Sequence, residues 1–352
     1  PASNCRATLR HLAEGAARRQ KSAMNILSRS QGLGISVASV LALTFAGAAV
    51  GCEDDDHDHV HDTTDAAAGD AGTDSAVPPA DGSVDGAQDG GVLTDAGPAP
   101  LQSISFAGVV GTTPFSCTQT YAGIGTSNAS ITPVDFRLYV SDVVLTKDDG
   151  TKVPFELEPD GVFQSSKVAL LDFEDRTGGC NNGTEALHTK LVGRAPAGKY
   201  TGITFTIGVP EALNHQNAAT AEAPLNLSGL FWNWQGGYKF LRLDGKVPST
   251  NSGFVMHLGS TGCTAGATPD SYVCTKRNAA TVTLTADPFA ATFLADWKAL
   301  LAGVAIDADK GGMPGCMSGD TDPECTPMLG ALGIDVASGN STKPQTFFRV
   351  SP

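Results

Sequence analysis

Val134-Asp135-Phe136-Arg137-Leu138-Tyr139-Val140-Ser141-Asp142-Val143-Val144-Leu145 has the two-residue period of a β-strand. The apolar side chains at 136, 138 and 140 fall on one face of this strand. The side chains at 135, 137 and 139 fall on the other face. The segment therefore predicts a long strand with an apolar face that must pack against a second layer.

Shorter runs of the same kind follow through the rest of the chain. They span residues 103–106, 200–208, 238–243, 253–258, 281–285 and 346–350. The run 168–173 is continuously apolar up to Asp172, which predicts a strand buried on both faces. Turn sequences rich in Asp, Pro and Gly separate these runs at 148–150, 159–161 and 196–198. Short strands with such spacing predict an all-β fold, a β-sandwich or a barrel-like domain, with one or two short helices.

One longer helix is predicted near residue 290. Asp287 is suited to the N-cap and Pro288 to the first helical position, and Gly303 is suited to the stop. Large apolar residues recur every four positions between them, at 289, 293, 297 and 301. This pattern predicts a helix from 288 to about 302 that places Trp297 in the core.

The predicted β-domain contains six cysteines. No Cys-x-x-Cys spacing is present among them, so a thiolate metal site is less favoured than disulfides. Local pairing predicts the bonds Cys263–Cys274 and Cys316–Cys325, each across a loop rich in Gly or Pro, and leaves Cys117–Cys180 as a long-range bond. We therefore expect a domain stapled by three disulfides.

The N-terminal segment has the features of an export signal. Met24 and Arg29 precede an uncharged apolar run from 35 to 50, which ends in small residues before Cys52. The run is shorter than the roughly 20 residues of a membrane-spanning helix. A cysteine at this position resembles the lipidated cysteine of a bacterial lipoprotein signal. We expect residues 1–23 to lie upstream of the true start and residues 24–51 to form the signal peptide.

Residues 52–100 form a segment of a different kind. Glu53 and twelve Asp give residues 53–100 most of the net charge of −14, and these residues include no Lys or Arg. Almost no large apolar residue is present, which predicts a disordered acidic tether with a reach of about 40 Å. His57, His59 and His61 lie among the carboxylates and form a possible weak metal-binding cluster.

Residues 101–352 are long enough for one large domain, and their balance of charge is only mildly acidic. A nucleic-acid-binding surface needs a basic face, which this composition does not supply. The domain contains three histidines, His188, His215 and His257. A pair of tryptophans, Trp232 and Trp234, lies between the last two, two residues apart, so that in a strand both point to the same face.

Several motifs in the order found here resemble the MbnP-like family, also called the metallo-mystery pair system four-Cys motif proteins. The resemblance extends from Phe106 to Val350. The motifs that carry it are Asp135–Asp142, Val168–Glu174, Gly208-Val209-Pro210 through Asn214-His215, Trp232–Phe240, His257–Cys263 and Gly315–Ser318.

The resemblance implies a non-enzymatic copper-binding protein, exported to the periplasm or the cell surface of a Gram-negative-type bacterium. It also implies a partner, a di-haem cytochrome c peroxidase-like enzyme that oxidises a tryptophan to kynurenine. Carried over to this chain, it predicts His215 and His257 as copper ligands, with His188 as a third candidate. The modified residue is predicted to be Trp232 or Trp234. Ring opening of an indole yields an aromatic amine, which can coordinate a metal where the indole nitrogen only donates a hydrogen bond.

Two other function classes remain open from the sequence. One is a hydrolase or carbohydrate-active β-sandwich that uses the carboxylates of Asp172 and Glu174, since glycoside hydrolysis needs a pair of carboxylates. The other is a structural surface domain without a metal. Metal analysis of protein from its own host distinguishes these classes from the copper protein.

Overall fold

The structure is a computed structural model, and it describes residues 99–352 except 234, 269 and 270. The chain divides into two units, residues 1–87 and 88–352, and all described residues belong to the second unit. The predicted signal peptide, the lipidation site Cys52, the tether and its histidine cluster lie outside the described residues. Among the described residues, no helix is both long and apolar enough to span a bilayer.

The larger of two main sheets has nine strands and is built around β4, the strand that the opening segment predicts. Its hydrogen-bonded order is β16 (Ala280–Leu284), β9 (Tyr200–Ile207), β4 (Ala129–Lys147), β12 (Leu241–Val247), β13 (Ser252–Leu258) and β18 (Gly315–Cys316). Three further strands pair with β4, namely β3 (Tyr121–Ile124), β5 (Lys152–Pro154) and β7 (Val168–Asp172). All five residues of β7 are buried, as its continuous apolar run predicts.

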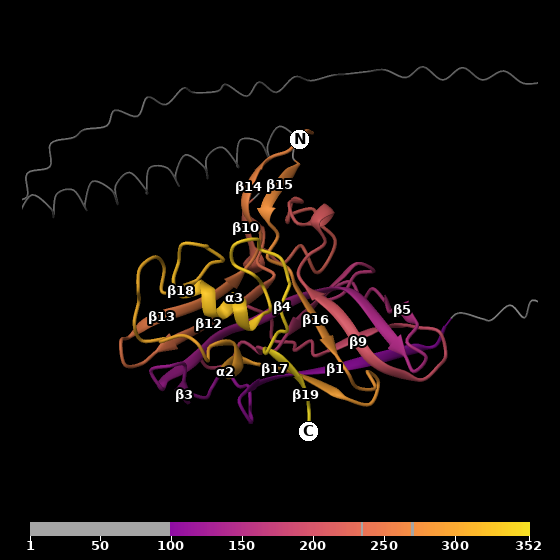
Figure 1. The fold of residues 1–352 in the computed structure, drawn as a ribbon, viewed down its shortest axis with the longest axis horizontal. Helices are drawn as coiled ribbons and strands as arrows, with labels where there is room; N and C mark the ends of the chain where they lie inside the picture. Colours follow the sequence, from indigo (N-terminus) through magenta and orange to yellow (C-terminus); the bar gives the residue numbers. More distant parts are fainter. Residues whose placement is uncertain (1–98, 234, 269–270) are drawn as a thin grey trace, which may run out of the picture. The chain divides into compact units, whose positions relative to one another are not determined.

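The second main sheet has six strands and covers the apolar face of the first. Its order is β19 (Phe348–Val350), β17 (Thr292–Asp296), β1 (Leu101–Val110), β8 (Lys190–Arg194) and β6 (Glu156–Leu157), with β2 (Thr113–Pro114) on β1. The ring of Phe106 in β1 lies 5.7 Å from that of Phe205 in β9. Aromatic rings from both sheets thus meet in one core. The predicted all-β sandwich is confirmed, and Figure 1 shows the arrangement of its strands.

Two short ribbons extend from the large sheet. One is formed by β10 (Phe231–Asn233) and β11 (Gly237–Tyr238), and the other by β14 (Thr261–Ala265) and β15 (Tyr272–Lys276). In Figure 1 the β14–β15 ribbon projects beyond the strands of the sandwich. Two turns of 3-10 helix, η2 (Glu211–Leu213) and η3 (Ser228–Leu230), lie in the long connection between β9 and β10.

The polar face of β4 is covered as well as its apolar face. Asp135 and Tyr139 are fully buried, and Arg137 is almost so. The β9–β10 connection provides the cover, since the Tyr139 hydroxyl donates to the carbonyl of Pro224 at 3.3 Å. The charged side chains of β4 therefore lie in the interior, where they need partners.

The predicted helix from 288 to 302 is wrong. Residues Thr292–Asp296 form β17, parallel to β1, and only Trp297–Leu300 form a helix, α2. The Asp296 carboxylate caps α2 by accepting from the amide of Lys298 at 2.9 Å, while Asp287 makes a local turn with Phe289. The four-residue spacing of large apolar side chains reflects burial in the sandwich, and pairing with β1 overrides the local helix signal. Trp297 is nevertheless fully buried, as expected. A second short helix, α3, spans Cys325–Ala331.

The structure forms the three disulfides that local pairing predicts. Cys117–Cys180 closes a loop of 63 residues, Cys263–Cys274 joins β14 to β15, and Cys316–Cys325 joins β18 to α3. Each closed loop restricts the unfolded chain and contributes about 2–4 kcal/mol to stability.

Candidate metal centre

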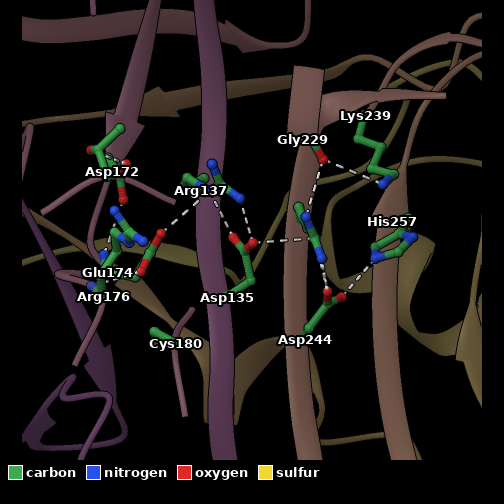
Figure 2. Close-up of polar contacts among 12 residues, drawn as sticks. Asp135, Arg137, Asp172, Glu174, Arg176, Cys180, Gly229, Lys239, Asp244 and His257 are labelled. Carbon is green, nitrogen blue, oxygen red and sulfur yellow. Dashed lines mark hydrogen bonds and ion pairs between the residues drawn. The ribbon is translucent and has the colours of Figure 1, made fainter. Parts of the chain in front are cut away.

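A row of buried charges crosses β7, β4, β12 and β13 on one face of the large sheet (Figure 2). The Arg137 side chain donates to the Asp135 carboxylate at 2.8 Å. Arg242 bridges two carboxylates, with contacts of 3.2 Å to Asp135 and 2.8 Å to Asp244. Because acidic and basic side chains alternate along the row, each buried charge has a counterion, which offsets the cost of removing that charge from water.

His257 ends this row and has one occupied and one free ring nitrogen. Its Nε2 lies 2.6 Å from the Asp244 Oδ1, so Nε2 carries the proton that the carboxylate accepts. Its Nδ1 is buried and has no hydrogen-bond partner within the described part of the chain. Burial opposes ionisation of Asp244, but the hydrogen bond from His257 and the charge of Arg242 lower the pKa of that carboxyl below its usual value. The Asp244 carboxylate therefore fixes the orientation of the His257 ring and leaves the lone pair on Nδ1.

Trp232 of β10 packs beside His257. The two ring centres are 6.4 Å apart, and the planes are inclined by 56°. The six-membered ring of the indole lies against the backbone of Gly259, where a β-carbon would collide with it. Trp232 also lines an open pocket of about 380 Å³, together with Ser260, Cys263 and Met317. The tryptophan is half-buried and can be reached from this pocket.

His215 is connected to the surroundings of Trp232 through Ser260. Ser260 lines the Trp232 pocket and also a small cavity that His215 and Cys274 line. The His215 Nε2 is 3.3 Å from the Cys274 Sγ and 3.2 Å from the Asn214 Nδ2. The Asn214 Nδ2 also lies 3.3 Å from the Ser260 Oγ, so Asn214 connects His215 with the segment that carries His257. Trp234, the other predicted tryptophan, lies outside the described residues.

His188 lies at the opposite end of the row of strands. Backbone pairing runs across the strands from His188 to His257 in four steps. The residues passed on the way are, in order, Asp172, Arg137 and Arg242. Four interstrand spacings separate His188 from His257 by about 19 Å. The His188 Nδ1 lies 2.6 Å from the carbonyl of Leu170, and its ring stacks on Phe163. Burial lowers the pKa of His188. These contacts give His188 a structural role, far from the other two histidines.

The two carboxylates considered for hydrolysis belong to the same buried row. Asp172 and Glu174 have no exposed surface, and burial raises the pKa of Asp172 to about 8 and also raises that of Glu174. The Asp172 Oδ1 accepts from the amide of Glu174, and Glu174 lies 3.9 Å from Arg137. A substrate does not reach side chains in this position, so the geometry does not favour the hydrolase interpretation.

Asp244 and Arg242 are the functional candidates that the sequence reasoning missed. The signal for them was present, because Arg242-Leu243-Asp244 repeats in β12 the charged alternation of Asp135-Phe136-Arg137 in β4. Two strands with such patterns, paired in register, place their charges on one face. The pairing itself was not evident from the sequence.

Comparison with known proteins agrees with this architecture. The family model for MbnP matches residues 99–318. Among solved structures, the chain is similar to MbnP from Methylosinus trichosporium, with 30% sequence identity, a TM-score of 0.64, and coverage of 72% of this chain and 98% of that one. No curated protein gives a significant match. The match of a family model over more than half of the chain, together with this structural similarity, shows that the chain belongs to the MbnP family.

Proposed function

We propose that this chain is an exported, non-catalytic copper-binding protein whose copper centre is built on His257 and Trp232. The observation that carries this proposal is the His257 ring, in which Nε2 is held by Asp244 while Nδ1 is buried and has no hydrogen-bond partner among the described residues. A metal-binding histidine characteristically donates its other ring N–H to a carboxylate, which fixes the ring and increases the basicity of the ligand nitrogen. Imidazole is a good ligand for copper.

Trp232 fits the role of the residue that a partner oxidises. Its indole lies within 6.4 Å of the His257 ring and lines a pocket open to solvent. In the unmodified indole the nitrogen lone pair belongs to the ring system and does not bind metal. Conversion to kynurenine opens the five-membered ring and frees an aryl amine beside His257. We propose a di-haem peroxidase-like enzyme as the partner that performs this oxidation, as expected from the family.

His215 is proposed as a further ligand, supported by its burial and by its connection to the 257–260 segment through Asn214. Trp234 remains the alternative site of modification. Copper bound at this centre provides a cation that the protein can store or pass on. The disulfides and the family indicate a domain that works outside the cytoplasm. Lipid anchoring through Cys52 is part of the proposal.

The test is metal analysis and peptide mapping of protein produced with and without a co-expressed di-haem partner. We expect one copper per chain only in the co-expressed protein, with the mass of kynurenine on the peptide that contains Trp232. His257→Ala should abolish this copper. His188→Ala is the matched control, because His188 is partly buried yet about 19 Å away, and it should retain copper.

Two results would overturn the proposal. One is stoichiometric copper in the His257→Ala variant. The other is copper-loaded protein with both Trp232 and Trp234 unmodified, which would remove the tryptophan oxidation from the account.

A further inference from the structure

The Cys263–Cys274 disulfide forms part of a second group of metal-binding atoms. The Sγ atoms of Cys263 and Cys274 and a ring nitrogen of His215 all lie within 4.8 Å of one another. Two sulfurs and one imidazole nitrogen at such separations are the donor set of a soft-metal site. In the oxidised protein the two sulfurs are bonded to each other and are poor ligands.

The contacts of His215 show which ring nitrogen faces the sulfur and in what form. The amide of Tyr238 donates to the Asn214 Oδ1 at 3.0 Å, which fixes the orientation of the Asn214 side chain. The Asn214 Nδ2 is then the donor toward the His215 Nε2, so Nε2 carries a lone pair. The disulfide sulfur of Cys274, 3.3 Å from the same nitrogen, has no hydrogen to donate. The Nε2 lone pair thus accepts from Asn214 and lies beside a sulfur atom 3.3 Å away, so a metal ion bound to that sulfur can take the nitrogen as a ligand in place of the amide hydrogen bond.

This disulfide is also the one that a reductant reaches most easily among the three. Cys274 is partly exposed on β15, whereas the cysteines of the other two disulfides are at most 2% exposed. His215 also lines an open pocket of about 930 Å³ with Glu211 and Tyr272, which provides a route for a metal ion. Another cluster with two cysteines, formed by Cys117, Glu174 and Cys180, is fully buried, so a metal ion has no comparable route to it.

We propose that reduction of the Cys263–Cys274 bond creates a site for a soft cation, of the class of Cu(I), held by both thiolates and the His215 Nε2. A dithiol reductant transfers two electrons and two protons to the disulfide and becomes a cyclic disulfide, leaving two thiols on the protein. Binding of Cu(I) then displaces the two thiol protons to solvent. This site needs neither His257 nor Trp232 and shares only His215 with the copper centre proposed above, so it can be tested with that centre disabled at His257.

The test uses the full chain produced without a partner enzyme and carrying His257→Ala, so that the other proposed centre is inactive. The oxidised protein and protein treated with limiting dithiol are titrated with Cu(I) against a chromophoric Cu(I) chelator, without oxygen. Alkylation and mass mapping identify which disulfide is open. We expect one additional Cu(I) in the reduced protein, with thiolate-to-copper charge-transfer absorption and the release of two protons.

Two variants make the result specific. Cys263→Ser with Cys274→Ser should bind no additional Cu(I) after the same treatment. His215→Ala keeps the disulfide and should weaken the additional site by at least about tenfold. The proposal is overturned if the reduced parent chain binds no more Cu(I) than the oxidised chain. It is equally overturned if the double serine variant, shown to be folded by circular dichroism, binds as much as the parent.

Discussion

Replacing Asp244 by Asn tests whether the carboxylate prepares His257 for copper. The substitution keeps the shape of the side chain and an oxygen that can accept from the His257 Nε2, now 2.6 Å from Asp244 Oδ1. It removes the negative charge that makes the imidazole a stronger donor. Arg242 keeps its contact with Asp135 at 3.2 Å, so the row of charges is not left without a counterion at that point.

The expected loss follows from the hydrogen bond that is weakened. A hydrogen bond to a charged group contributes about 1.5–3 kcal/mol. Partial loss of this contribution corresponds to about ten- to hundredfold weaker copper binding, the range found for residues that support a metal ligand. Removing one charge from the buried row also lowers the stability of the domain, so the folded fraction is measured in parallel by thermal unfolding.

The assay is competition for copper with a chromophoric chelator, on protein matured by the partner. Asp172→Asn is the matched control, because Asp172 is also a buried carboxylate in the same row but lies on β7, with β4 and β12 between it and the strand of His257. We expect copper affinity to fall in Asp244→Asn and to stay within about twofold in Asp172→Asn. Equal losses in both variants would show that the row of charges acts as a whole. An unchanged affinity in Asp244→Asn would refute the proposed role of the carboxylate.

Three further predictions concern the fold around the site. Gly259→Ala should displace the Trp232 ring and destabilise the domain by about 1–3 kcal/mol, measured by tryptophan fluorescence and thermal unfolding. Gly253→Ala is the control, because the space around its added β-carbon is open, and it should change neither the fluorescence nor the melting temperature. Burial raises the folded-state pKa of Asp172 to about 8, so ionisation of this carboxyl opposes folding as the pH rises from about 4 to 8. The stability of Asp172→Asn relative to the parent should therefore increase between pH 5 and pH 8. A constant difference in the free energy of urea unfolding over that range would contradict this. Burial and the neighbouring carboxyl of Glu324 raise the pKa of Asp322 to about 6. The Glu324 Oε2 is buried and has no hydrogen-bond partner in residues 99–352 as far as they are described. Glu324→Gln should therefore supply a donor and stabilise the domain at pH 7 by about 1 kcal/mol, and a lower melting temperature at pH 7 would contradict the pairing.

Much of the architecture was predictable because local patterns and global packing agree. The alternation around Phe136 predicted β4, the apolar run ending at Asp172 predicted a doubly buried β7, and the spacing of the cysteines predicted all three disulfides. The helix around Phe293 was mispredicted because large apolar residues in a buried strand that leads into a helical turn recur here at the same four-residue spacing as in a helix.

The sequence by itself determined the fold class, the disulfide framework and the short set of residues with metal-binding chemistry. These properties depend on local periodicity and on how few histidines and cysteines there are. Only the tertiary structure decided which of these residues meet. Strand pairing places Arg242 opposite both Arg137 and His257, brings Asp244 to the His257 ring, and puts His188 at the far end of the row. Register between strands that are distant in sequence depends on packing across the whole sheet, and no local pattern encodes it.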